Sequence, residues 1–158
     1  MARVYREYYD SGQLYLEYFR INNKMFDKRI LYCRNGNVLE EWNHTGNNII
    51  RLYKRYIDDN GNISQIGNYV NNKKNGMWAY YNYADWRFEK LSFINYCNYL
   101  DGHWHGESKC IYASNGKIKK SGYYVRSNRE GEFKEFDIDG NLTLHEVYEN
   151  NKLMRKIL

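Results

Sequence analysis

The chain has 158 residues, which fits one domain of ordinary size and is long enough to bury a core without disulfides. It contains no proline, 18 tyrosines and 12 glycines, and strong helix formers are scarce, so the composition excludes a helical bundle, a membrane span and a disordered tail. The net charge of +5, from 24 Lys and Arg against 19 Asp and Glu, is modest, and no stretch resembles a basic nucleic-acid arm.

The first residues contain no apolar run that resembles a signal peptide or a membrane span. Cys33, Cys97 and Cys110 are an odd number of cysteines, which fits free thiols in a reducing compartment. We therefore expect a cytoplasmic protein, in a host cytoplasm or a virion if the source is a virus, that is neither secreted nor transmembrane.

Aromatic residues recur at a regular interval along the chain. All but the fourth are followed, four or five residues later, by the glycine of an Asn-Gly, Asp-Gly or Ser-Gly turn. The six aromatics are Tyr8, Tyr32, Tyr56, Tyr81, Tyr112 and Phe136, spaced 24, 24, 25, 31 and 24 residues apart. Between the turns the segments alternate apolar and polar residues, which is typical of strands. Each repeat is therefore predicted to be a β-hairpin of two short strands.

The predicted units together form one repeat domain over residues 1–158, and they lie near residues 8–31, 32–55, 56–80, 81–111, 112–135 and 136–158. The unit near 81–111 has Asp85 and Trp86 where a turn glycine belongs and is expected to carry an irregular loop. Glycines supply the positive φ that tight hairpin turns need. The predicted turn glycines are Gly12, Gly36, Gly61, Gly76, Gly106, Gly116, Gly131 and Gly140.

One hairpin cannot bury a face alone, so the units should stack edge to edge. The predicted fold is all-β, an elongated single twisted sheet of about six consecutive hairpins. One aromatic position per hairpin then forms a ladder along the sheet. The candidate interaction face consists of Tyr32, Tyr56, Trp78, Tyr80, Tyr81, Trp104, Tyr112, Tyr124 and Phe136.

Residues 56–81 and 112–136 each carry an aromatic, a following Asn-Gly turn, a further tyrosine and a later glycine. This pattern resembles MORN repeats, and most of all their looser variant in bacterial YwqK-type antitoxin proteins and in large DNA viruses. Residues 101–107 look like the Asn-Gly-Lys-x-His-Gly-Glu segment of such repeats. The resemblance implies a curved single sheet of hairpins used for protein assembly, sometimes as a dimer, with lipid-headgroup binding proposed for some members.

Cys97, His103, His105 and Cys110 place four soft metal ligands within fourteen residues, which raises the question of a zinc site. The spacing matches no familiar zinc motif, and the repeat itself accounts for His105 as the residue before a glycine. We expect no metal and no cofactor.

Two adjacent pairs of carboxylates, Glu40–Glu41 and Asp58–Asp59, raise the question of acid–base catalysis. Neighbouring residues on a strand face opposite sides of the sheet, and Asp58–Asp59 leads into a turn. No phosphate loop, nucleophile elbow or dinucleotide motif is present. We expect no enzymatic activity and name no catalytic residue.

Two other binding functions stay open as less favoured alternatives. Residues 51–56 and 117–124 interleave basic and aromatic residues, as single-strand nucleic-acid surfaces do, but the scattered acids leave only a weak positive field. Residues 76–82 look somewhat like hairpin repeats that capture a quaternary ammonium in an aromatic cage, although those repeats are shorter and belong to exported proteins.

The last predicted unit stops partway through its second strand and exposes an apolar end, made of Leu153, Met154, Ile157 and Leu158. Pairing of two such ends by two-fold symmetry is the simplest closed arrangement. The alternative is that Arg155 and Lys156 protect the edge and the tail frays as a simple cap. The sequence therefore predicts a non-enzymatic scaffold that binds a protein partner and forms a homodimer, with membrane phospholipid-headgroup binding as the alternative.

Overall fold

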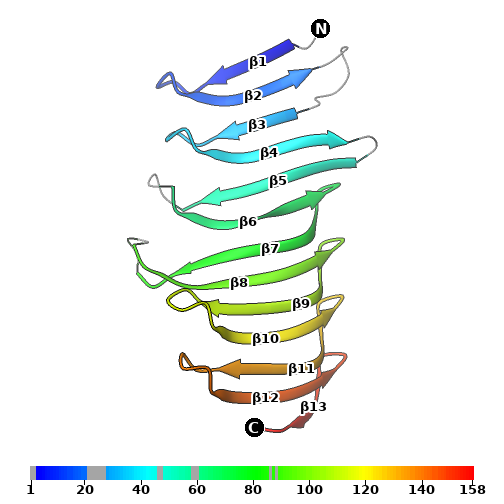
Figure 1. The fold of residues 1–158 in the computed structure, drawn as a ribbon. Helices are drawn as coiled ribbons and strands as arrows, with labels where there is room; N and C mark the ends of the chain where they lie inside the picture. Colours follow the sequence, from blue (N-terminus) through cyan, green and yellow to red (C-terminus); the bar gives the residue numbers. More distant parts are fainter. Residues whose placement is uncertain (1–2, 21–27, 46–47, 58–60, 86, 88) are drawn as a thin grey trace. The chain divides into compact units, whose positions relative to one another are not determined.

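The computed structural model describes residues 3–20, 28–45, 48–57, 61–85, 87 and 89–158. These residues form thirteen β-strands and no helix (Figure 1), in one open sheet whose strands follow one another antiparallel in sequence order. The predicted fold class, an all-β sheet of consecutive hairpins, is confirmed. The part of the chain described here contains no helix with the length and apolar character that a membrane span needs.

The chain divides into two compact units, Met1–Lys73 and Lys74–Leu158, called unit 1 and unit 2 below. In unit 1 the strands pair antiparallel from β1 through β6. These strands are β1 (Arg3–Tyr8), β2 (Leu14–Arg20), β3 (Lys28–Tyr32), β4 (Val38–Thr45), β5 (Asn48–Tyr56) and β6 (Ile63–Val70).

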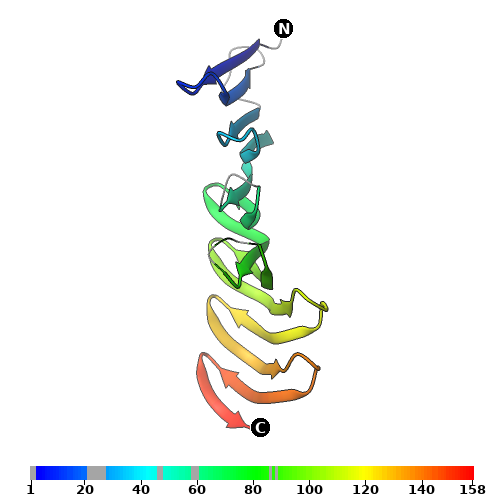
Figure 2. The ribbon, with the colours of Figure 1, turned by 90° about the vertical axis from the view of Figure 1, so that its left-hand side faces the viewer.

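Unit 2 contains the remaining strands, also paired antiparallel in sequence order. They are β7 (Lys73–Tyr83), β8 (Leu91–Leu100), β9 (His103–Tyr112), β10 (Ile118–Val125), β11 (Asn128–Phe136), β12 (Leu142–Glu149) and β13 (Lys152–Lys156). The strands β9 to β12 are visibly bent, which gives this part of the sheet a hollowed face and an outer face (Figure 2).

Five of the predicted turn glycines lie in connections between the first and second strand of a hairpin: Gly12, Gly36, Gly61, Gly116 and Gly140. Gly61 and Gly116 have φ values of 87° and 71°, in the left-handed region that glycine adopts without strain. The predicted aromatics Tyr8, Tyr32, Tyr56, Tyr112 and Phe136 each end the strand before such a turn. The regular aromatic spacing therefore marks strand ends.

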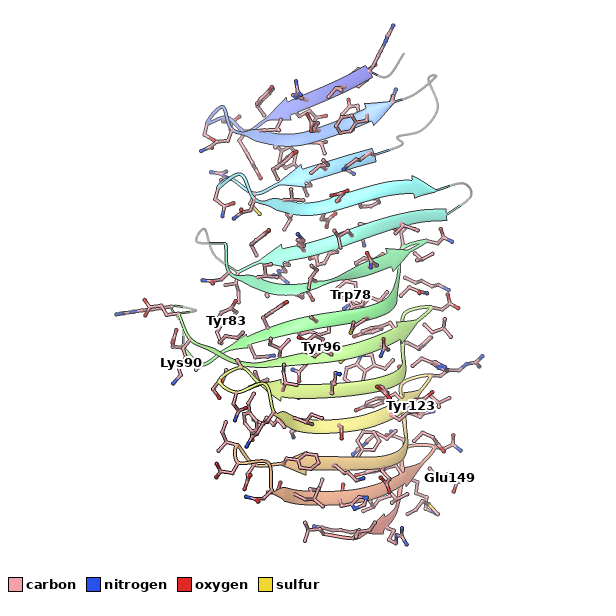
Figure 3. All side chains as sticks on the ribbon, in the orientation of Figure 1. Trp78, Tyr83, Lys90, Tyr96, Tyr123 and Glu149 are labelled. Carbon is pink, nitrogen blue, oxygen red and sulfur yellow. The ribbon has the colours of Figure 1, made fainter. Side chains whose placement is uncertain are left out.

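At the opposite ends of the strands, four connections within the described residues are two-residue turns in which both residues have positive φ, the signature of a type I′ hairpin turn. These turns are Asn71–Asn72, Asp101–Gly102, Arg126–Ser127 and Asn150–Asn151. In Figure 3, Tyr123 and Glu149 lie at this end of the strands, whereas Tyr83 and Lys90 lie at the end with the longer connections.

Three of the glycines predicted to lie in turns lie instead inside strands. Gly76, Gly106 and Gly131 belong to β7, β9 and β11, with φ values of 69°, 100° and 74°. At Gly106 and Gly131 the pairing register shifts, so these glycines form bulges a few residues after the two-residue turns. Positive φ is needed in both settings, which is why the sequence pattern did not separate them.

The irregular loop expected near Asp85 connects β7 to β8. It is closed by a backbone hydrogen bond from Ala84 N to Lys90 O at 2.9 Å. Asp85 Oδ1 accepts hydrogen bonds from the backbone N–H groups of Arg87 and Glu89, at 3.0 and 3.3 Å. A carboxylate thus organises the loop where the other hairpins use a glycine.

Candidate binding groove

The register of unit 2 aligns one row of residues across six strands, on the hollowed face of the sheet. This floor row consists of Tyr80, Asn95, Cys110, Lys120, Glu135 and Leu144. A neighbouring row on the same face includes Cys97, Ser108 and Gly122. Both rows line a groove of about 750 Å³ that runs across β7 to β12.

Rings in edge-to-face contact form one side of this groove, and we call them the aromatic spine. The spine consists of Trp78, Tyr99, Trp104, Tyr124, Phe133 and Tyr148. Successive ring centroids lie 4.8–6.4 Å apart, within the range where edge-to-face pairs attract. Trp78 is 0% exposed and Tyr148 is also buried, so two of these rings belong to the small buried core.

Lys74 is enclosed by three rings at one end of the spine. Its Nζ lies 4.2 Å from the Trp78 centroid, 5.1 Å from that of Tyr80 and 5.2 Å from that of Tyr99. This is the geometry of a cation–π cage, and the chain's own ammonium occupies it. Burial lowers the pKa of Lys74 below 10.5, while the Cys97 thiolate would raise it.

A short hydrogen-bond network joins this cage to the groove. Lys74 Nζ donates to Tyr80 Oη at 2.7 Å, and the Tyr80 and Tyr99 hydroxyls bond to each other at 2.8 Å. Trp104 Nε1 donates to Tyr99 Oη at 2.6 Å. The bonds fix three ring orientations at once, so this side of the groove is preorganised.

Gly122 makes room for the Phe133 ring. A methyl group at Gly122 would overlap three ring carbons of Phe133, which reaches over from the neighbouring strand β11. In that position Phe133 contacts Tyr124 and Tyr148 on its two sides, with centroids 5.4 and 5.2 Å away. A missing side chain on β10 thus allows the spine to continue.

The four residues considered as zinc ligands do not converge. Cys97 and Cys110 are buried on the groove side, and the Cys97 Sγ lies 3.6 Å from Ser108 Oγ. Trp104 packs into the spine, so His103 and His105, on either side of it in β9, alternate to the other face. Within the described ranges, no three His, Cys, Asp or Glu side chains are grouped as metal ligands.

Burial raises the pKa of the Cys97 and Cys110 thiols, while hydrogen bonding to Ser108 and nearby lysines act in the opposite direction. A thiol with a raised pKa stays protonated near neutral pH and is a weak nucleophile. These two cysteines therefore act as small apolar residues in the groove wall.

The carboxylates considered as an acid–base pair lie in unit 1 and have separate partners. Glu40 Oε2 accepts a hydrogen bond from Trp42 Nε1 at 2.8 Å, and Glu41 pairs with Lys28 at 2.9 Å. Asp58 and Asp59 lie outside the described residues.

The structure brings together part of the predicted aromatic face. Trp78, Tyr80, Trp104 and Tyr124 belong to the spine or to the groove lining. Tyr81 follows Tyr80 in β7 and therefore points to the opposite face. Tyr112 and Phe136 end their strands, where Tyr112 Oη donates to Phe136 O at 3.0 Å. Tyr32 and Tyr56 belong to unit 1.

Sequence analysis missed Lys74, Tyr99, Gly122, Arg129 and Phe133 as parts of this surface. Tyr99, Tyr124 and Tyr148 each lie two residues before a two-residue turn, and this shared position is the signal that identifies the spine. Lys74, Trp104 and Arg129 share a second position, just after those turns. Both positions can be found in the sequence only after the two-residue turns are located, and most of these turns lack glycine.

The predicted self-association end includes β13, an edge strand that pairs with β12. Leu153, Met154, Ile157 and Leu158 are 46%, 53%, 48% and 51% exposed. The segment after β13 is tied to the sheet, because Ile157 N donates to His145 O at 2.8 Å and His145 N donates to Leu158 O at 3.1 Å.

No protein-family model matches this chain, and a search of curated proteins finds no match.

Proposed function

We propose that this chain is a non-enzymatic repeat scaffold that binds a partner protein in the groove of unit 2. The observation that carries the proposal is the groove itself, an open channel of about 750 Å³ lined by aromatic, amide and charged side chains from β7 to β12. Such a channel matches an extended peptide segment, which presents alternating side chains and polar backbone groups. The preorganised spine reduces the entropic cost of binding.

We also propose that the hairpins are a loose variant of MORN repeats. Support comes from the paired strands, the aromatic strand ends and the positive-φ glycines that recur from hairpin to hairpin. A profile built from homologous sequences would test this, and a profile in which the aromatic and glycine positions vary freely would contradict it.

The binding proposal is tested by panning a random peptide display library on the full chain. Asn95→Trp places a large side chain on the groove floor, at a residue whose side chain makes no hydrogen bond among the described residues. Met77→Trp is the matched control, because Met77 is 59% exposed and alternates to the other face. We expect enriched peptides that bind the chain and the control but not Asn95→Trp. No enriched peptide, or equal binding to both variants, would contradict the proposal.

Self-association through the C-terminal edge is a second proposal, supported by two exposed apolar side chains on β13, two more just after it, and an unpaired strand edge in the described sheet. Light scattering at tens of micromolar, compared between the full chain and Met154→Lys, should show a dimer that the substitution dissociates. A monomer in both samples rules out self-association.

Sedimentation with anionic liposomes tests the alternative function, binding of phospholipid headgroups. Co-sedimentation of the chain with the liposomes would support headgroup binding over both proposals.

A further inference from the structure

We infer that the segment bound in the groove of unit 2 is acidic, with carboxylates that pair with cations along the groove. This inference rests on the proposed function and names the chemical class of the partner segment. It follows from which charged groups in and beside the groove already have a partner of opposite charge.

The groove lining contains four basic residues, Lys109, Lys120, Arg129 and Lys134, and two acidic residues, Glu135 and Glu146. Glu135 Oε1 pairs with Lys120 Nζ at 2.7 Å, whereas Glu146 Oε2 accepts a hydrogen bond at 2.8 Å from an uncharged group, the Tyr148 hydroxyl. Lys134 pairs with Glu132.

Lys109 pairs with Tyr96 and Ser121 in the row on the opposite face, so its side chain does not serve the groove. Arg129 is a cation of the lining with no carboxylate within 4.0 Å among the described residues.

Arg129 is already oriented for a carboxylate. Its guanidinium lies 4.2 Å from the Tyr148 ring centroid and 5.9 Å from that of Phe133. Its Nε donates to Asn151 Oδ1 at 3.3 Å, and its Nη groups have no acceptor in the described structure. A guanidinium held on aromatic faces with its fork open pairs with a carboxylate through two parallel hydrogen bonds.

A second cation flanks the opposite side of the groove floor. Lys119 Nζ lies 4.7 Å from the Phe93 centroid and 5.3 Å from that of Tyr112, two residues paired across β8 and β9 next to the floor row. It too has no carboxylate partner among the described residues. Cations on both sides of the floor match acidic side chains on a strand laid between them.

The rings favour an acidic peptide over single-stranded nucleic acid. Bases stack on open aromatic faces. In the spine, the neighbours of Tyr124 are Trp104 and Phe133, at interplanar angles of 86° and 89°, and Trp78 is 0% exposed. Rings that pack edge to face against one another leave little ring face on which a base could stack. The carboxylates of an acidic peptide do not need a ring face, because they pair with the cations.

The test uses the full chain and the peptides that panning selects as binders of the chain but not of Asn95→Trp. We expect these peptides to contain at least about twice as many Asp and Glu as Lys and Arg. In fluorescence anisotropy, Arg129→Gln should weaken the best peptide by about tenfold, as loss of a bidentate charged pair does. Arg155→Gln is the control, since Arg155 is exposed on β13 outside the groove lining.

Replacing Glu by Gln in the peptide should weaken wild-type binding to the same level and leave Arg129→Gln binding unchanged. Groove-dependent peptides that are neutral or basic, or an Arg129→Gln variant with unaltered affinity, would overturn this inference and leave the proposed function standing. The absence of any groove-dependent peptide would overturn both. An oligo(U) RNA that binds more tightly than the best peptide, and competes with it, would assign the cations to nucleic acid instead.

Discussion

The three rings around Lys74 show at the scale of single residues how this surface combines packing with charge. Removing an ammonium from water is costly, and this cost appears as the lowered pKa of Lys74. The rings of Trp78, Tyr80 and Tyr99, and the bond to Tyr80 Oη, offset it. Two of the three rings, Trp78 and Tyr80, come from residues 76–82, and the chain's own lysine occupies the space between the rings.

We predict that Lys74→Ala lowers the free energy of unfolding by about 1–2 kcal/mol, because it removes a partly desolvated cation–π contact. Tetramethylammonium should then raise the melting temperature of the variant by entering the vacated cage. Thermal unfolding with and without the salt measures this, with Lys73→Ala as an exposed control. An equal response of wild type and variant to the salt would show that the rings do not form a cage.

Gly122→Ala is predicted to destabilise the chain by about 1–3 kcal/mol, because the added methyl overlaps the Phe133 ring and forces repacking of the spine. Ser121→Ala, on the other face of β10, is the control. Urea unfolding of both variants and of Gly122→Ala combined with Phe133→Leu measures the effect. The smaller side chain should recover part of the loss, and strict additivity of the two substitutions would count against the contact.

Among the elements, the hairpins were predictable and the register was not. Aromatic strand ends and Asn-Gly or Asp-Gly turns are local signals, so the long connections and the irregular loop at Asp85 follow from the sequence. The groove depends on which residues lie side by side across strands. That alignment is set by bulges at Gly106 and Gly131 and by turns such as Arg126–Ser127, whose residues carry no strong turn signal.

Arg126 offers a test of the turn assignment, because its φ of 47° is a conformation that asparagine adopts more readily than arginine. We predict that Arg126→Asn stabilises the chain by about 0.5–1 kcal/mol through relief of backbone strain. Arg155→Asn, in an extended strand, should bring no gain. Chemical denaturation of the two variants measures the difference, and a loss of stability at Arg126 would argue against a type I′ turn.

For the whole molecule, the abundance of half-buried tyrosines predicts loss of stability at high pH. Burial raises the pKa of five tyrosines above 10.0: Tyr32, Tyr56, Tyr69, Tyr81 and Tyr124. The unfolded chain releases these protons near 10.0, whereas the folded chain retains them to higher pH. The stability they contribute is therefore complete below about pH 10 and is lost as the pH rises through the folded pKa values. Lys74 has a lowered pKa, so its contribution to stability increases as the pH rises, opposite to that of the tyrosines.

Urea unfolding at about pH 8, about pH 10 and about pH 11 should show this decline. Tyr124→Phe should make the decline shallower, since it removes one of the contributing hydroxyls. Tyr8→Phe should leave it unchanged, because Tyr8 is 58% exposed. A stability that stays constant or rises over this interval would contradict the prediction.

The central claim is that the hollowed face of unit 2 binds the partner, and two adjacent residues of β8 test it directly. Asn95 lines the groove, whereas Tyr96 pairs with Ala79 on the opposite face. Photo-methionine, a diazirine crosslinking amino acid far smaller than tryptophan, is placed at each position in turn in the full chain so that the groove stays open, and the selected peptide is added before irradiation. We predict crosslinked peptide at position 95 and none at position 96. Crosslinking at position 96 without crosslinking at position 95 would contradict the account.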